Sequence, residues 1–264
     1  MNPRTTPEPA HPVVSREEWL RARLALLARE KEHTRQRDKL SRARRELPWV
    51  LIDKDYRFAG PRGTESLADL FRGRSQLVVY HFMFGPDWKE GCPSCSFVSD
   101  SLDGAVVHLE HRDVTLTMVS RAPFPRIRAF KERMGWRFPW VSSHGSDFNS
   151  DFHVAPSDEG RATGRTSYNY QPHDGVMEEM HGVSVFHRDA QDRIYHTYST
   201  YARGAETLVS AYAVLDLVPK GRDEEGGITT ATGTTTGSTA TRRIGSRRAS
   251  SSPARGDSGR RRSS

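Results

Sequence analysis

The sequence predicts an α/β protein whose central mixed sheet is flanked by helices. Residues 77–84 are nearly all apolar, which is typical of a strand buried on both faces. A helical segment and a second apolar run at 114–119 follow that strand. Two strand-like runs, 183–187 and 194–198, then flank a charged turn and predict a hairpin. Strands that alternate with helices and end in a hairpin indicate one mixed sheet covered by helices.

The N-terminal region predicts a long helical arm at residues 13–47. Ser15 and Glu18 fit a capping box, and Pro48 marks the limit of the helix. Three leucines recur at helical intervals in its first half: Leu20, Leu24 and Leu27. Residues 1–12 are rich in proline and are expected to be disordered. The arm is a candidate surface for homo-oligomerisation.

The α/β domain is expected at residues 48–220, and its elements follow in order. They are strands at 49–52 and 56–58, a helix at 64–71, the strand at 77–84, a helix at 92–110, the strand at 114–119, a helix at 124–134 closed by Gly135, a strand at 138–141, an irregular stretch at 143–165, a strand at 167–170, the hairpin and a helix at 205–217.

Residues 221–264 are expected to form a disordered basic tail. They contain no aromatic residue, and their large aliphatic residues are Ile228 and Ile244. Such a segment cannot bury enough apolar surface to offset its chain entropy. Nine arginines against four acidic residues give it +5 of the net charge of +7. The tail is expected to be solvated, and its charge allows weak, non-specific contact with nucleic acid.

The sequence favours a cytoplasmic protein. It has no apolar run of 18 residues and no apolar segment of a secretory signal at its N-terminus, so neither a membrane span nor secretion is expected. Its two cysteines lie too close together to hold a large secreted fold together.

The candidate chemistry lies in Gly91-Cys92-Pro93-Ser94-Cys95, where the strongest strand ends and a helix begins. A helix N-terminus has unpaired N–H groups and a partial positive charge, which stabilise a thiolate. Cys92 is therefore the candidate nucleophile. Pro93 suits the first helical turn, where an N–H would have no helical partner. Cys95 follows on the same side and is the candidate thiol that resolves a mixed disulfide.

Two other interpretations of the cysteines stay open. They can be buried structural residues, or they can bind zinc with His108 and His111 in a Cys-x2-Cys-x12-His-x2-His order. The two histidines are one residue too close for a zinc finger, and Ser99 and Ala105 stand where a finger needs apolar residues. A non-enzymatic protein that binds zinc or a partner is thus one functional alternative, while the preferred interpretation requires neither a metal nor a cofactor.

The segments Tyr80–Trp88 and Gly91–Phe97 resemble an uncharacterised bacterial family of thioredoxin-like proteins, the predicted dithiol–disulfide oxidoreductases, related in fold to thioredoxins and peroxiredoxins. The resemblance spans residues 14–223 and includes further stretches at 111–115, 120–123, 134–138, 145–149 and 196–204. It implies a thioredoxin-like fold and a redox-active pair at Cys92 and Cys95. A thiol or disulfide protein, or a small-molecule thiol, is then the expected partner.

A thiol peroxidase is the second functional alternative, because the wider fold group includes peroxiredoxins. There the first cysteine attacks a peroxide and the second resolves the sulfenic acid. The loop departs from the peroxiredoxin pattern, since Gly85 and Lys89 stand where proline and threonine are usual. Residues 180–182 lack the usual arginine before the hairpin, so Arg121 and Arg203 are candidates to replace it in space.

Other residues are candidates for lining the site. The loop before the motif supplies four of them: Pro86, Asp87, Trp88 and Lys89. His181 stands where thioredoxins usually carry a cis-proline that faces the cysteines. Lys89 and His81 would each lower the Cys92 pKa if they lay close to it. The plain alternative for Lys89 is a solvated loop lysine. For His81 it is a core histidine with satisfied hydrogen bonds, and this alternative is preferred.

Overall fold

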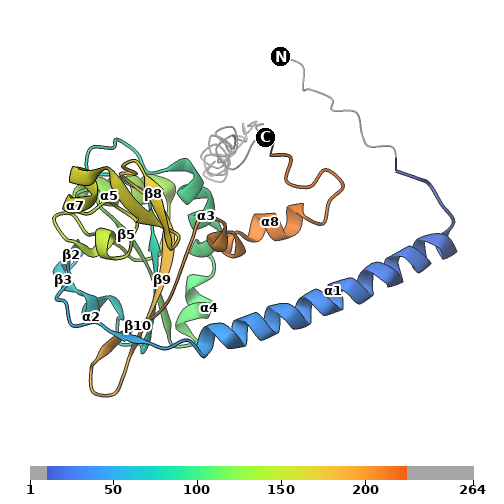
Figure 1. The fold of residues 1–264 in the computed structure, drawn as a ribbon, viewed down its shortest axis with the longest axis horizontal. Coiled ribbons are helices and arrows are strands. Elements are labelled where there is room, and N and C mark those ends of the chain that lie inside the picture. Colours follow the sequence, from blue (N-terminus) through green and yellow to red (C-terminus); the bar gives the residue numbers. More distant parts are fainter. Residues whose placement is uncertain (1–10, 225–264) are drawn as a thin grey trace, which may run out of the picture. The chain divides into compact units, whose positions relative to one another are not determined.

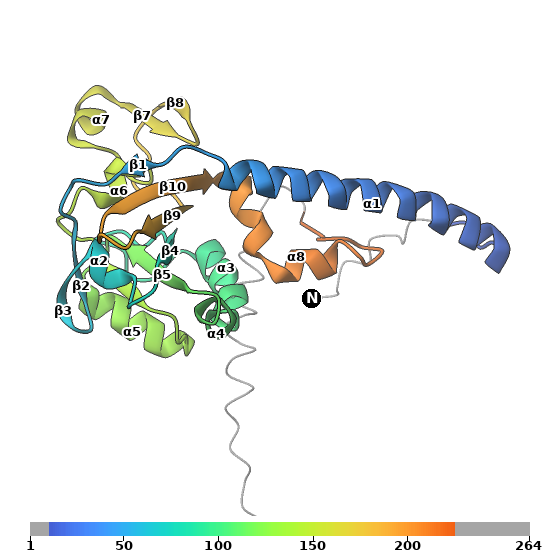
Figure 2. The same cartoon turned by 90° about the horizontal axis from the view of Figure 1, so that it is seen from below.

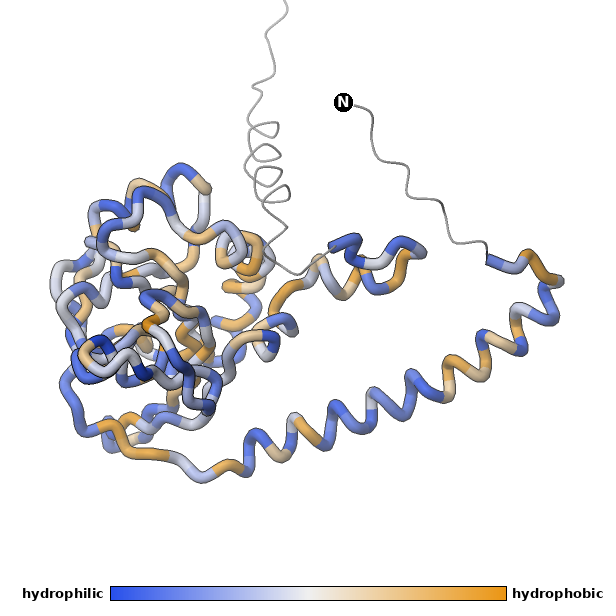
Figure 3. Tube along the Cα trace, turned by 45° about the horizontal axis from the view of Figure 1, so that its top comes forward, coloured by the Kyte–Doolittle hydropathy of each residue, from blue (hydrophilic) through white to orange (hydrophobic). Residues whose placement is uncertain are grey.

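The computed structural model describes residues 11–224, which divide into two compact units, one ending at Trp49 and one beginning at Val50 (Figure 1). The first unit contains helix α1, Arg16–Arg45, which has no buried residue. The predicted capping box is present, because the Glu18 N–H donates to Ser15 Oγ and the Ser15 N–H donates to the Glu18 carboxylate. Hydrophilic residues dominate α1, with apolar ones between them (Figure 3). The segments predicted to be disordered, 1–12 and 221–264, fall mostly on residues 1–10 and 225–264, which lie outside the described residues.

The second unit is built on one mixed sheet of eight strands, in the order β1-β10-β9-β4-β5-β6-β2-β3. Strand β4 lies at its centre, parallel to β5 and antiparallel to β9, and Figure 2 shows these strands side by side. The strands span Val50–Leu51 (β1), Arg57–Gly60 (β2), Gly63–Ser66 (β3), Gln76–His81 (β4), Val114–Ser120 (β5), Trp140–Ser142 (β6), Gly182–Arg188 (β9) and Ile194–Tyr201 (β10). A separate hairpin joins β7, Arg165–Tyr168, to β8, Gln171–Asp174.

Helices cover both faces of this sheet. The helical segments span Leu67–Leu70 (α2), Pro93–Asp103 (α3), Val106–Glu110 (α4), Phe124–Met134 (α5), Phe148–Asp151 (α6), Asp158–Thr163 (α7), Ala202–Leu208 (the 3-10 helix η1) and Ser210–Leu215 (α8). One core cluster joins α3 and α5 to Tyr80, and we call this side the cysteine face. The other cluster joins α2 and α6 to Val79, and we call this side the histidine face because His81 lies there against two phenylalanines.

The order of the central strands is thioredoxin-like, as the sequence predicts. Strand β4 leads through α3 and α4 to its parallel neighbour β5, and α5 leads on to β6, which is parallel to β5. The hairpin β9–β10 then continues the sheet on the other side of β4. The nearly continuous apolar character of β4 follows from this central position, because both of its faces are covered. In the part of the chain described, no helix is long and apolar enough to cross a bilayer.

The two strands predicted at 49–52 and 56–58 are present as β1 and β2, although each overlaps its predicted range only in part. They are not neighbours in the sheet, since β1 pairs with β10 and β2 pairs with β3 and β6.

Helix boundaries also differ from the prediction. The helix expected at 64–71 begins only at Leu67, because Ser66 caps it with Asp69 and the residues before the cap are extended as β3. The helix expected at 92–110 is divided at Gly104 into α3 and α4. Val209 has an extended backbone and divides the predicted C-terminal helix into η1 and α8. The stretch expected to be irregular at 143–165 contains the short helices α6 and α7.

Candidate active site

Cys92 lies at the N-terminus of α3, on the cysteine face. Its backbone N–H donates to the Met83 carbonyl at 3.0 Å, which ties the loop back to the end of the central strand. Pro93 occupies the first turn of the helix and is exposed. Gly91 is packed so tightly that a Cβ would lie 2.7 Å from the Phe82 ring. A glycine is therefore needed for the chain to enter the helix at this point.

Both cysteines are free thiols, and they lie 3.8 Å apart. Cys92 is half-buried, whereas Cys95 is 2% exposed and belongs to the core cluster of the cysteine face. The Cys92 thiol is thus partly accessible to a reactant, whereas the Cys95 thiol is shielded from solvent.

The surroundings lower the pKa of Cys92 to about 6. The largest cause is a side-chain hydrogen bond from Cys95, and the backbone N–H groups of Cys95 and Ser94 add to it, while burial opposes them. At pH 7 a thiol of this pKa is mostly thiolate, in a ratio of roughly ten to one. Burial raises the pKa of Cys95 well above its usual value, and the neighbouring Cys92 raises it further. The pair therefore has one thiolate and one thiol near neutral pH.

Tyr80 is a site residue that the sequence did not reveal. Its hydroxyl is fully buried and, among the described residues, has no oxygen or nitrogen partner. It interacts with the Cys95 thiol and lowers the pKa of that thiol against the effect of burial. Burial in turn raises the pKa of the Tyr80 phenol. The phenol is thus a neutral hydrogen-bond donor placed beside the buried cysteine.

A cavity of about 350 Å³ adjoins the cysteines. Its walls come from four segments that are distant in the sequence: the end of β4, the first turns of α3, the stretch before β9 and the region of η1 and α8. Most of the lining is apolar and includes Met83, Phe97, Val98, Met177, Met180 and Val209. The polar side chains that it contains include Glu179, His181 and Glu206.

Glu179 is a buried carboxyl in this lining. Its side chain is 2% exposed, and Arg121 Nη1 lies 3.1 Å from its Oε1 atom. Its Oε2 atom has no hydrogen-bond partner among residues 11–224. Burial is the largest cause that raises the pKa of Glu179, to about 7, although Arg121 acts in the opposite direction. The carboxyl is therefore poised between its charged and neutral forms near neutral pH.

His181 lies in the cavity wall, immediately before β9. Its Nε2 atom is 3.3 Å from the Ala202 carbonyl oxygen, and burial lowers the pKa of its ring. The Tyr168 hydroxyl donates to the His181 carbonyl at 2.9 Å. A Cβ at Gly182 would lie 2.5 Å from the Tyr201 ring, so the backbone can pass there only as glycine.

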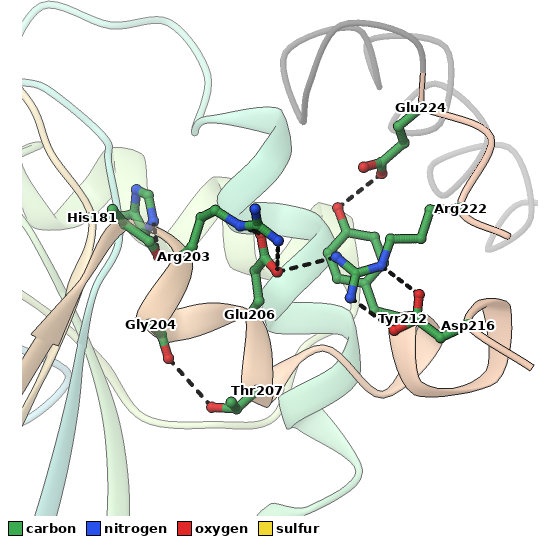
Figure 4. Close-up of polar contacts among 10 residues, drawn as sticks. His181, Arg203, Gly204, Glu206, Thr207, Tyr212, Asp216, Arg222 and Glu224 are labelled. Carbon is green, nitrogen blue, oxygen red and sulfur yellow. Dashed lines mark hydrogen bonds and ion pairs between the residues drawn. The ribbon is translucent and has the colours of Figure 1, made fainter. Parts of the chain in front are cut away.

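The C-terminal wall of the cavity is held by charged side chains (Figure 4). Glu206 accepts hydrogen bonds from Arg203 Nε at 2.8 Å and from Arg222 Nη1 at 3.1 Å. Arg222 also pairs with Asp216 at 2.8 Å and lies over the Tyr212 ring, 4.1 Å from its centroid. The wall thus depends on residues close to the end of the described chain.

The other candidate residues lie outside the cavity lining. Arg126 Nη1 donates to the carbonyls of Pro86 and Trp88, at 2.7 and 2.9 Å, and so fixes the loop that also carries the exposed Asp87 and Lys89. Arg203 is 83% exposed and turned to Glu206, and Arg121 contacts Glu179 from outside the lining. Of the candidates beyond the cysteines, the structure brings only His181 into the lining of this cavity.

His81 lies on the histidine face, away from the cysteines. Its Nε2 atom is 2.8 Å from Ser184 Oγ, and its ring packs against Phe148 and Phe152 at centroid distances of 5.6 and 5.9 Å. Burial lowers its pKa to about 3. It is therefore a neutral core histidine, which agrees with the plainer of the two sequence interpretations.

The four residues of the zinc interpretation do not gather into one site. His108 and His111 are exposed, on and just after α4, beyond the break at Gly104. Within residues 11–224, no group of three or more His, Cys, Asp or Glu side chains is arranged to hold a metal ion.

Comparisons with known proteins find peroxiredoxins and a disulfide isomerase among the similar solved structures. Peroxiredoxin Q of Xanthomonas campestris is 14% identical over 62% of this chain and 96% of its own, with a TM-score of 0.39. A PrxQ variant of Xylella fastidiosa is 14% identical over 60% of this chain and 88% of its own, with a TM-score of 0.37. A protein of Bacteroides thetaiotaomicron assigned as a disulfide isomerase is 16% identical over 67% and 94%, with a TM-score of 0.35.

Among curated proteins, none matches this sequence. A family model matches residues 8–243, and thus all of the described domain and the helical arm. The chain belongs to this family, whose description is "bacterial protein of unknown function (DUF899)".

Proposed function

We propose that this protein is a dithiol–disulfide oxidoreductase in which Cys92 is the nucleophile and Cys95 the resolving thiol. One observation carries the proposal: at the start of a helix, the half-buried Cys92, whose thiol has a pKa of about 6, lies 3.8 Å from the buried Cys95. The two thiols differ as the reaction requires. Cys92 must be a thiolate before it attacks the substrate, and Cys95 must stay a protonated thiol until the mixed disulfide has formed.

In the first step the Cys92 thiolate attacks one sulfur of a disulfide, forms a mixed disulfide and releases a thiolate. In the second step Cys95 loses its proton and attacks Cys92 Sγ, which releases the other half of the substrate and leaves a Cys92–Cys95 disulfide. The Tyr80 phenol stabilises the Cys95 thiolate during this step, because it is the neutral donor beside that sulfur. Two electrons pass from the protein to the substrate, and no bound cofactor takes part. The partner is a thiol or disulfide compound, in a compartment where the pair is kept reduced.

A thiol peroxidase on the same cysteines is less well supported. A peroxidase benefits from a cation that polarises the peroxide, and the cavity lining contains neither arginine nor lysine in the described chain. Arg121 and Arg203, the two candidates for that role, pair with Glu179 and Glu206.

The redox equilibrium of the purified protein in glutathione buffers tests the proposal, with thiol blocking and intact mass as readouts and zinc assayed on the same sample. We expect reversible loss of two hydrogen masses and no bound zinc. In Cys95→Ser we expect a mixed disulfide trapped on Cys92. Thiols that stay reduced, or one zinc per chain that protects them, would refute the proposal. Loss of the Cys92 thiol with stoichiometric peroxide, much faster than for free cysteine, would favour the peroxidase instead.

A further inference from the structure

The cavity beside the cysteines has a size and composition that point to its occupant. A volume of about 350 Å³ lies at the lower end of the range for small-molecule sites, roughly 300–1,000 Å³. Both thiols of the motif contribute to its lining, so a molecule held there lies against the reactive sulfur. A recess of this size, closed by segments from four parts of the chain, fits a small molecule better than a loop of a protein partner.

The lining favours apolar groups. Three methionines, Met83, Met177 and Met180, contribute unbranched and polarisable side chains that adapt to an irregular apolar ligand. Phe97 and Val98 extend the apolar surface from the first turns of α3. Polar substituents that lie against this apolar surface would lose their hydration without gaining equivalent hydrogen bonds.

The charges of the lining disfavour anions. Glu179 and Glu206 both line the cavity, whereas no lysine or arginine of the described residues does. The Cys92 thiolate adds a negative charge at the same wall. A ligand that carries carboxylates would meet the Cys92 thiolate and find no cation in the lining to pair with, because the nearby arginines lie outside the lining and already pair with Glu179 and Glu206.

We propose that this cavity binds a small, uncharged disulfide with apolar substituents, held with one sulfur against Cys92. The inference rests on the proposed function and names the substrate class of that same site. The reduced protein and the substrate R–S–S–R exchange two electrons: the S–S bond of the substrate breaks, the Cys92–Cys95 bond forms, and two R–SH molecules leave. One proton comes from Cys95, and the other is the proton that Cys92 released to solvent. A dithiol such as dithiothreitol restores the protein in the assay.

Single-turnover oxidation of the reduced protein by four probes tests the proposal. The probes are dipropyl disulfide (apolar), bis(2-hydroxyethyl) disulfide (neutral and polar), oxidised glutathione (anionic) and insulin (a protein disulfide). Each rate constant is divided by that of the same probe with the thiolate of 2-mercaptoethanol, which removes the intrinsic reactivity of the probe. We expect dipropyl disulfide to be favoured at least tenfold over each of the others.

Variants connect this preference to the cavity. Val98→Trp fills the cavity from α3, and Val107→Trp is its matched control, because Val107 is on α4 and 52% exposed. We expect Val98→Trp to reduce the preference at least fivefold and Val107→Trp to leave it unchanged. Met180→Lys adds a positive charge to the lining, and we expect it to raise the relative rate with oxidised glutathione several-fold. Thermal unfolding shows whether each variant is folded.

The outcomes separate this inference from the proposed function. If the Cys92–Cys95 disulfide forms with every probe in proportion to intrinsic reactivity, the function stands and the cavity proposal is overturned. A preference for insulin or oxidised glutathione overturns it as well. If no probe produces the disulfide, the proposed function itself fails. If the preference for dipropyl disulfide survives in folded Val98→Trp and Met180→Lys, the preference arises elsewhere and the cavity is not the binding site.

Discussion

Two neighbouring residues of strand β4 have opposite roles because they point to opposite faces of the sheet. Tyr80 on the cysteine face has a hydroxyl without an oxygen or nitrogen partner among the described residues, beside a thiol and a cavity. His81 on the histidine face is as deeply buried, and its Nδ1 atom also has no hydrogen-bond partner among the described residues, but its Nε2 atom lies 2.8 Å from Ser184 Oγ and its ring packs against Phe148 and Phe152. Burial alone therefore does not mark a functional group. Each of the two residues has a buried polar atom without a partner, so the difference lies in what surrounds it: a thiol and a cavity beside Tyr80, and packed phenylalanine rings beside His81.

The largest expected effect is on the reactivity of the two cysteines of the cysteine face. In Cys92→Ser, the only remaining thiol is Cys95, which is buried and has a raised pKa. We expect alkylation by iodoacetamide at pH 7 to slow at least a hundredfold, because little thiolate is exposed. Cys95→Ser is the control, and it should keep the faster reaction because Cys92 stays accessible, with a midpoint above that of the unchanged protein because the Cys95 thiol is the largest cause of the lowered Cys92 pKa. Equal rates in the two variants would show that the thiols are not distinct.

On the histidine face, acid should destabilise the fold through His81. Its folded pKa is lowered to about 3, so between pH 6.5 and 3 the unfolded chain binds a proton that the folded chain does not. Stability is then lost as the pH falls, by about 3 kcal/mol at pH 4. Urea unfolding at several pH values measures this loss. His81→Gln should flatten the dependence, whereas His111→Gln, at an exposed position, should not; a steep profile retained in His81→Gln would assign the effect to other groups.

Glu179 on the cysteine face should give the opposite dependence. Its folded pKa is raised to about 7, so between its unfolded value and pH 7 the folded chain binds more protons than the unfolded chain. Stability should therefore fall as the pH rises, by about 2 kcal/mol between pH 5.5 and 7.5. Glu179→Gln should remove this slope, and Glu132→Gln, an exposed residue of α5, should keep it. An unchanged slope in Glu179→Gln would mean that the carboxyl titrates normally.

The smallest expected effect concerns Tyr80. Tyr80→Phe removes a hydroxyl that has no oxygen or nitrogen partner in the described residues, so we expect stability to change by less than about 1 kcal/mol. The same change should slow the resolving step several-fold, because the phenol no longer favours the Cys95 thiolate. Release of the second thiol from a mixed disulfide measures this step. A variant that is strongly destabilised but resolves at the normal rate would make Tyr80 a structural residue like His81.

The sequence contained enough information to place the cysteines but not the cavity. The placement of Cys92 at a helix start depends on local signals, namely an apolar strand, a glycine and Pro93, and these act over a few residues. Glu179 and Met180 lie in a stretch without strand or helix periodicity, so nothing local marks them. Only the approach of distant segments in the folded chain places them beside Cys92.

The features of the fold that the sequence did not predict have a similar cause. The strand at Val50 is defined by its partner β10, nearly 150 residues further on, and a periodic pattern says nothing about which strand it joins. The helix starts at Leu67 and not at Thr64, because Ser66 and Asp69 form its capping box and the residues before the cap pair as β3.

The tight packing at Gly91 has a consequence for how this protein can diversify. A single methyl group added there would lie 2.7 Å from the Phe82 ring and 3.1 Å from the Phe130 ring, so the entry to α3 would have to shift. The methionines around the cavity have unbranched, adaptable side chains, whose exchange for other apolar residues of similar volume is usually tolerated. Selection can thus retune the ligand preference through the lining while the position of the reactive sulfur stays fixed. Gly91, which has no side chain and no chemistry of its own, is expected to be among the residues least open to neutral drift.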